Sequence, residues 1–249
     1  MFIETLFLIG VVAGLLGPFL LVKRQTLAVD AIAHGSFGGA AIAYFYGINP
    51  LYGALVFAAL LAYALTLYFK QRQEIVLGLI LVLGMSLGLV FFSLAGISKD
   101  EIIVYLFGNM SLDEFKTILN WIAGLITIGF LTWKSRHIFS VFFDPEGSQV
   151  RGIPVTWIEG IFNGLLAVVI VGMLSVVGAL LVSGLMIIPA LIAERIVPSF
   201  RYRLIIAGVT GGLGMVGGYF LANMLGLPPT PVVIFLLAFI YGVLGVIKK

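Results

Sequence analysis

The chain has 249 residues, of which 61% are hydrophobic and 10% charged, and its mean hydropathy is +1.20. This composition excludes a soluble globular domain and predicts an all-α, polytopic membrane protein with a single transmembrane domain over 1–249. Because there is no cysteine, disulfides and thiolate metal sites are excluded. The formal charge of +3 does not indicate nucleic-acid binding here, because in a membrane protein the positions of the basic residues report topology.

Apolar runs of membrane length recur from one end of the chain to the other. The run from Thr156 to Ile196 is too long for one span, and we expect a tight turn near Ser175 to divide it. This predicts about nine (eight to nine) transmembrane helices, at about residues 2–22, 27–47, 51–69, 75–95, 117–133, 156–174, 176–194, 204–225 and 232–247.

The basic residues predict the orientation of these spans. With the N-terminus outside, 12 of the 14 lysines and arginines fall on the inner side, and only Lys99 and Lys116 fall outside. Short loops rich in Lys and Arg face the cytoplasm, so we expect an outer N-terminus and a cytoplasmic C-terminus.

Glycines recur four residues apart inside several of the predicted spans. The pairs Gly10/Gly14, Gly84/Gly88 and Gly208/Gly212 have the spacing that lets helix backbones approach closely in lipid. We interpret them as packing sites within the chain rather than as a seam between copies.

The second predicted span contains an acid and a base at membrane depth. Counted from Arg24 at the membrane edge, Asp30 lies ~9 Å and His34 ~15 Å into a hydrocarbon layer ~30 Å thick. A spacing of four places both side chains on one helix face. An ionisable group at that depth needs a partner, a wet cavity or a ligand. A carboxylate oxygen and an imidazole nitrogen on one face can share a divalent metal.

Three other interpretations of this pair stay open at this point. Asp30 and His34 could hydrogen-bond neighbouring helices, or Asp30 could lie close enough to the cytoplasmic edge to be hydrated. The pair could also relay protons in a self-contained, proton-coupled carrier. As a metal site the pair is incomplete, because Zn²⁺ prefers four ligands and Mn²⁺ often six. A homodimer would double the set around a two-fold axis. The other histidine, His137, lies in a basic cluster that we interpret as topological.

The longest predicted outer segment, 96–116, carries two capping-box patterns. Ser98 with Glu101 predicts the start of a short helix that Gly108-Asn109 would end, and Ser111 with Glu114 predicts the start of the fifth span. The short helix would present a possible outer gate formed by Tyr105, Leu106 and Phe107. A plain surface loop is the alternative.

One inner segment has the features of a docking element. Pro189 and Pro198 bracket a short helical piece, which we expect over Ala190–Val197. A proline-kinked span end is the alternative. The chain has no Gly-x-x-x-x-Gly-Lys-Ser/Thr phosphate loop, so it is not predicted to be an enzyme that hydrolyses ATP by that route.

Three ordered stretches resemble the permease subunit of bacterial ABC importers for zinc, manganese and related divalent metals. They are Lys23-Arg24 with Asp30-Ala-Ile-Ala-His34, Tyr105-Leu-Phe-Gly108, and the Val177–Ala190 stretch that leads towards the ATPase-docking helix. Val29 stands where the family commonly has Gly, and Gly38 where many members have Pro. Neither departure removes a ligand.

The resemblance implies a multi-pass permease of the bacterial cytoplasmic membrane that acts as a homodimer. It also implies two cytoplasmic ATP-binding subunits, an extracytoplasmic metal-binding protein and contact with membrane lipid, but no nucleic acid. Asp30 and His34 would coordinate the passing ion, which is cargo rather than a permanently bound cofactor. The ATPase-docking residues would be Pro189, Ala190, Leu191, Ile192, Ala193, Glu194, Arg195, Ile196 and Val197. One Asp and one His per chain suit Zn²⁺ and Mn²⁺ equally.

Overall fold

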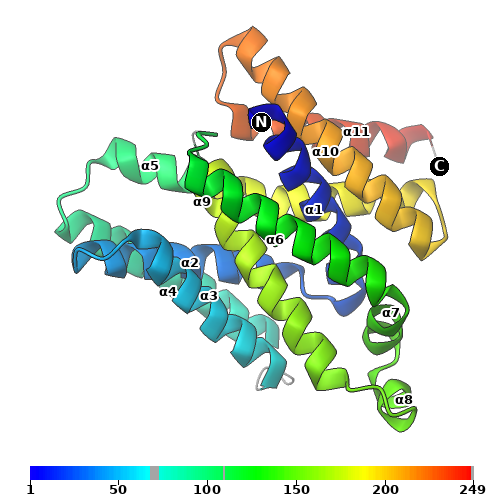
Figure 1. The fold of residues 1–249 in the computed structure, drawn as a ribbon. Coiled ribbons are helices and arrows are strands. Elements are labelled where there is room, and N and C mark those ends of the chain that lie inside the picture. The colour runs from blue at the N-terminus through cyan, green and yellow to red at the C-terminus, as the bar shows by residue number, and fades with distance from the viewer. Residues whose placement is uncertain (68–72, 109, 248–249) are drawn as a thin grey trace.

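The computed structural model describes residues 1–67, 73–108 and 110–247, and within them the chain is built from helices (Figure 1). Their order and bounds are α1 (Phe2–Lys23), α2 (Thr26–Phe45), α3 (Pro50–Leu67), α4 (Gln73–Leu94), α5 (Lys99–Phe107), α6 (Glu114–Trp133), α7 (Ser135–Phe143), α8 (Pro145–Val150), α9 (Val155–Ile196), α10 (Phe200–Leu225) and α11 (Pro229–Ile247). The all-α prediction is confirmed for these ranges.

Seven of the helices in the described ranges are long and apolar enough to cross a membrane: α1, α3, α4, α6, α9, α10 and α11. The 42 residues of α9 would extend about 63 Å if straight, twice the thickness of the hydrocarbon layer. The helix is instead broken at Gly178, where φ is 76° and ψ 165°. The predicted break therefore exists, three residues beyond Ser175. The count of nine spans is not confirmed.

The long helices run in one bundle, with α5 at one end and α7 and α8 at the other (Figure 1). We call these the α5 end and the α7 end. Lys23 and Arg24 lie at the α7 end, where Lys23 pairs with Glu159 near the start of α9. Lys99 and Lys116 lie at the α5 end, at the starts of α5 and α6. The described basic residues thus divide between the ends in the way that the sequence predicted.

The core of the bundle is formed by α1 and α9. In their most apolar windows, 72% of the α1 residues and 78% of the α9 residues are buried, against 22% for α4 and for α11. The glycine pairs pack within the chain, as predicted: Gly10 of α1 lies against Gly211 of α10, and Gly84 of α4 lies against Gly35 of α2. A β-carbon on Gly10, Gly211 or Gly84 would collide with the backbone of the facing helix.

An ion pair that the sequence analysis did not predict joins α1 to α9 at the α7 end. Lys23 Nζ lies 3.0 Å from Glu159 Oε1, and the two side chains are only 10% and 19% exposed. The same ammonium group lies 4.5 Å from the centre of the Phe142 ring. Glu159 is therefore buried against a cation although it lies in the first turns of α9.

We expect Glu159→Ala to lower the free energy of unfolding by about 3 kcal/mol, because it leaves the buried Lys23 ammonium without its counter-charge. The double change Lys23→Met with Glu159→Leu removes both charges and is expected to recover most of that loss. Glu146→Ala, at an exposed position of α8, is the control. Chemical denaturation in detergent measures all three. Equal stability of Glu159→Ala and wild type would show that the pair is not stabilising.

Candidate functional site

The predicted acid–base pair lies on α2, directly after a tight connection from α1. Arg24 ends α1 in the left-handed region, with φ 55°, and Gln25 is the N-cap of α2. Asp30 and His34 follow one turn apart on the same face, as their spacing requires. They are both half-buried, whereas the residues between them are buried.

In the first half of α2, the described part of the chain covers all of the helix surface except one strip. The pair lies on this strip, which is only partly buried. Its half-buried members are Thr26, Leu27, Asp30 and His34. The remaining faces are closely covered: Gly39 lies against Gly53 of α3, and Gly38 lies against Gly84 of α4. Helix α2 is therefore held firmly from two sides, and its acid–base strip faces away from both.

The ionisable groups on this strip are one carboxylate and one imidazole, which offer oxygen and nitrogen donors on a single helix face. Asp30 and His34 interact electrostatically, and His34 Nδ1 is buried without a hydrogen-bond partner among the described residues. Those residues contain no group of three or more His, Cys, Asp and Glu side chains that could hold a metal. A divalent ion held by Asp30 and His34 would thus need further ligands of another kind, from water or from a second chain.

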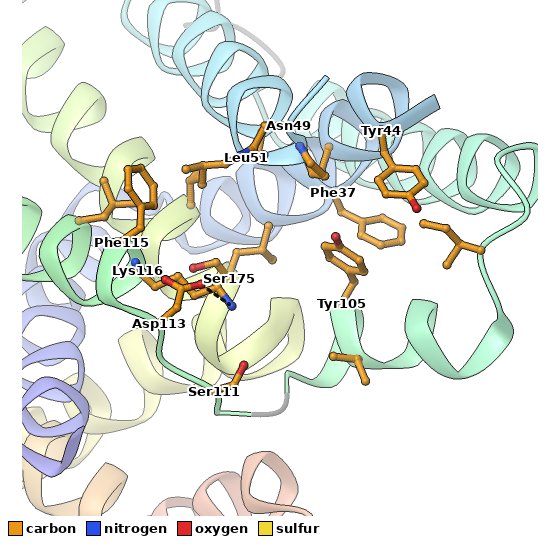
Figure 2. A pocket seen from close by; sticks show the side chains of 18 residues that line it. Phe37, Tyr44, Asn49, Leu51, Tyr105, Ser111, Asp113, Phe115, Lys116 and Ser175 are labelled. Carbon is orange, nitrogen blue, oxygen red and sulfur yellow. Dashed lines mark hydrogen bonds and ion pairs between the residues drawn. The ribbon is translucent and has the colours of Figure 1, made fainter. Parts of the chain in front are cut away.

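A cavity of about 680 Å³ opens at the α5 end (Figure 2), and we call it the α5 cavity. It lies between α2, α3, α5, α6 and the break in α9. Polar groups line one part of it, among them Asn49, Asp113, Lys116 and Ser175. Its wall includes Phe37, which follows His34 by one helical turn on α2.

Aromatic rings line one side of the α5 cavity. Phe37 is fully buried, and its ring centre lies 5.3 Å from that of Phe92 on α4. Tyr105 of α5 stacks on Phe92 at 4.9 Å, and Tyr44 contacts the same ring at 6.0 Å. Figure 2 shows Phe37, Tyr44 and Tyr105 grouped on one side of the cavity. These four rings, the aromatic layer, come from three helices.

Of the three residues predicted as an outer gate, only Tyr105 lines the α5 cavity. Leu106 packs against the hydrophobic core, and Phe107 ends α5. The short helix itself is present where Ser98 predicted its start, and Gly108 follows its end with φ 70°. Asn109, the second residue of the predicted stop, lies outside the described residues.

The predicted cap of the fifth span is wrong. The structure begins α6 at Glu114 and caps it with Asp113, whose Oδ1 accepts a hydrogen bond of 2.7 Å from the Lys116 backbone N–H. Ser111 instead lines the α5 cavity. Aspartate directly before the first helical residue can accept from the free N–H groups of the first turn, so Asp113 replaces Ser111 in that role.

The predicted docking segment differs from the expected short piece at its start. The helix α9 runs unbroken through Pro189 to Ile196, so Pro189 does not open a separate helix; Pro198 follows the helix end, as predicted. Ala190, Ile192 and Ala193 are buried within the chain, and exposure starts at Glu194. The surface that this segment offers to another protein therefore runs from Glu194 onward.

Two arginines hold this exposed end in place. Arg203 donates hydrogen bonds of 3.0 Å to Glu194 Oε1 and to the Val197 carbonyl. The guanidinium of Arg195 lies 4.1 Å from the centre of the Tyr241 ring of α11 and donates to its hydroxyl at 2.9 Å. Hydrogen bonds with α10 and α11 therefore fix the conformation of the C-terminal end of α9.

Membrane-length helices around a half-buried acid–base strip and a polar cavity define a membrane transport protein. The chain belongs to the ABC 3 transport family, which it matches over residues 2–248. The resemblance predicted from the three motifs is thereby confirmed: the chain is a permease of an ABC-type transporter.

Named relatives and a solved structure agree with this family. The chain is 35% identical to the chelated iron transport system membrane protein YfeD of Yersinia pestis, over 84% of this chain and 71% of that protein. It is 30% identical to the high-affinity zinc uptake system membrane protein ZnuB of Buchnera aphidicola, over 94% and 91%. The fold matches PsaBC from Streptococcus pneumoniae, solved in complex with Fab, with a TM-score of 0.86 at 22% identity, over 98% of this chain and 89% of that chain.

Proposed function

We propose that this chain is the permease subunit of an ATP-driven importer for a bare divalent metal ion, Mn²⁺ or Zn²⁺. Two copies form the translocation path, and Asp30 and His34 of each copy coordinate the passing ion. The observation that carries the proposal is the half-buried strip of α2, where an acid and a base share one face and lack further ligands within the described chain.

A second copy is the simplest source of the missing ligands. A two-fold axis beside the open strip of α2 would bring two carboxylates and two imidazoles together. Four protein groups, with water, fit the coordination of Mn²⁺ or Zn²⁺. A site that also has to release its ion gains from being sparse, because strong permanent coordination would stop transport.

The difference in charge between the two ends of the bundle supports a proposed orientation, and the partners are proposed from it. The α7 end carries most of the described basic residues, so we place it in the cytoplasm, with the N-terminus outside. Counting α2 and both halves of α9 as separate spans gives the nine predicted from the sequence. The permease would lie in the bacterial cytoplasmic membrane. An extracytoplasmic metal-binding protein would deliver the ion to the α5 cavity, and two ATP-binding subunits would dock near Glu194 on the cytoplasmic side.

The support for metal as cargo is twofold. The named relatives are metal-transport membrane proteins for zinc and for chelated iron. The described pair offers one oxygen and one nitrogen donor, which suits both Mn²⁺ and Zn²⁺. Family membership also favours ATP as the energy source over the proton-coupled carrier.

Transport in proteoliposomes tests the proposal. The permease is reconstituted together with its ATP-binding subunit. Mn²⁺ or Zn²⁺, each in turn, is then added outside the vesicles with the delivery protein. We expect accumulation that requires ATP and is indifferent to a pH gradient. Accumulation by the permease alone, driven by a pH gradient without ATP, would instead establish the proton-coupled carrier.

A further inference from the structure

Two motifs that are far apart in the sequence meet backbone to backbone at the α5 end. Gly108 follows α5 with φ 70°, and Gly178 breaks α9 with φ 76°. A β-carbon on Gly108 would lie 2.6 Å from the Val177 carbonyl oxygen, and one on Gly178 would lie 2.6 Å from the Leu106 carbonyl oxygen. Both positions need glycine for conformation and for space.

A third helix joins this contact through one side chain. Thr230, in the first turn of α11, is 1% exposed, and its hydroxyl lies 2.5 Å from the Phe107 carbonyl oxygen and 3.1 Å from that of Val177. The Met110 N–H donates to the Val176 carbonyl at 2.9 Å beside it. Because Phe107 ends α5 and Val177 ends the first half of α9, one hydroxyl serves the free carbonyls of two helix ends.

The contact lies between the proposed gate and the proposed docking segment. Tyr105, two residues before Phe107, stacks on Phe92 in the aromatic layer of the α5 cavity. From Gly178 the second half of α9 runs without a further break to Ile196, about 27 Å away. About half of that half-helix is buried against its neighbours, and it is continuous, so it can carry a displacement from one end of the bundle to the other.

We propose that Thr230 is a positioning residue that couples the inner end of α9 to α5, so that movement of the docking segment opens and closes the aromatic layer. This inference rests on the proposed function, since it needs an ATPase at the inner face. The bistable element is the contact of Gly108 with Gly178. The single proton of the Thr230 hydroxyl can be given fully to Phe107 or to Val177, but not to both at once.

The absence of cysteine in this chain makes the coupling measurable. Val104 of α5 lines the α5 cavity and is 42% exposed, so Val104→Cys introduces a single thiol beside Tyr105. The rate of maleimide labelling is measured in the complete permease–ATPase complex, without nucleotide and with ATP plus vanadate. The parent Val104→Cys protein is compared with the same protein carrying Thr230→Val or Thr230→Ser.

We expect the labelling rate of the parent to differ between the two nucleotide states. Thr230→Val keeps the branched shape but loses the hydroxyl, so the ratio of its two rates should fall to near unity. The Mn²⁺ carried per ATP hydrolysed should fall by about fivefold or more. Thr230→Ser keeps the hydroxyl and should retain the response of the parent. If Thr230→Val does not assemble, Thr230→Ala is measured in the same way.

A purely structural role has a different signature from coupling. If Thr230→Val raises labelling equally in both nucleotide states and leaves their ratio unchanged, the inference is overturned while the proposed function stands. If the parent complex binds its ATPase but its labelling has no nucleotide response, the inference is likewise overturned while the proposed function stands. If the permease binds no ATPase, the proposed function fails and this inference fails with it.

Discussion

Replacing either member of the acid–base pair is expected to abolish most metal uptake while leaving the complex assembled. Asp30→Asn and His34→Gln keep side-chain size but remove an anionic oxygen and an imidazole nitrogen from the strip of α2. Even changes in groups that only orient metal ligands cost roughly 10–100-fold in affinity or activity, so loss of a direct ligand should lower uptake by about 100-fold or more. Uptake of Mn²⁺ and of Zn²⁺ into proteoliposomes measures the effect.

The two substitutions should behave as a unit. If Asp30 and His34 bind the same ion, the double variant Asp30→Asn/His34→Gln should lose little more uptake than either single variant, because one missing ligand already prevents coordination. Leu27→Ala is the matched control, since Leu27 lies on the same half-buried strip and offers no ligand. Wild-type uptake by either single variant, with ATPase bound normally, would contradict the ligand role.

Helix positions in this chain could be predicted because apolar length and terminal residues report them directly. Lys23 and Arg24 mark the end of α1, and Gly108 follows the end of α5. The division of residues 156–196 was predicted, but its location was placed at Ser175 instead of Gly178. The sequence does not distinguish a glycine that adopts a positive φ from a glycine that lets two helices pack closely, and this chain has 31 glycines. Only the fold distinguishes the two uses.

The sequence indicates the polar pair of the candidate site but not the aromatic residues near it. Asp30 and His34 share a face because their spacing requires it, and polar groups at membrane depth are conspicuous in a sequence. The aromatic layer is not conspicuous, because Phe37, Phe92 and Tyr105 come from different helices and belong to a chain with 20 phenylalanines. Tertiary packing selects them.

Contacts between distant segments were equally hidden in the sequence. Glu159 acquires its buried partner Lys23 only because α1 and α9 lie side by side in the core. Thr230 lies among prolines, where the sequence indicates only a turn, yet it bonds the ends of two other helices. Asp113 replaced Ser111 as the cap of α6 because cap identity depends on which residue adopts extended backbone geometry, here φ −96° and ψ 173°.

Placing a charge on the exposed end of α9 is expected to release the ATPase. Charged residues at the buried positions Ala190 and Ala193 would test folding rather than docking. Val197 is the better position, because it is half-exposed and follows the last residue of the helix. If this segment is the centre of the interface, Val197→Glu should cost about 2 kcal/mol of binding free energy, or roughly 30-fold in affinity.

The matched control for Val197→Glu carries the same substitution elsewhere at the α7 end. Val150, at the end of α8, is 89% exposed, and Val150→Glu adds an identical charge to the same face of the membrane without touching the docking segment. Co-purification with the ATP-binding subunit and metal-stimulated ATP hydrolysis are measured for both. A selective loss in Val197→Glu assigns docking to the end of α9, because bulk electrostatics at the inner face would weaken both variants alike. Normal binding and hydrolysis in Val197→Glu would move the docking surface away from this segment.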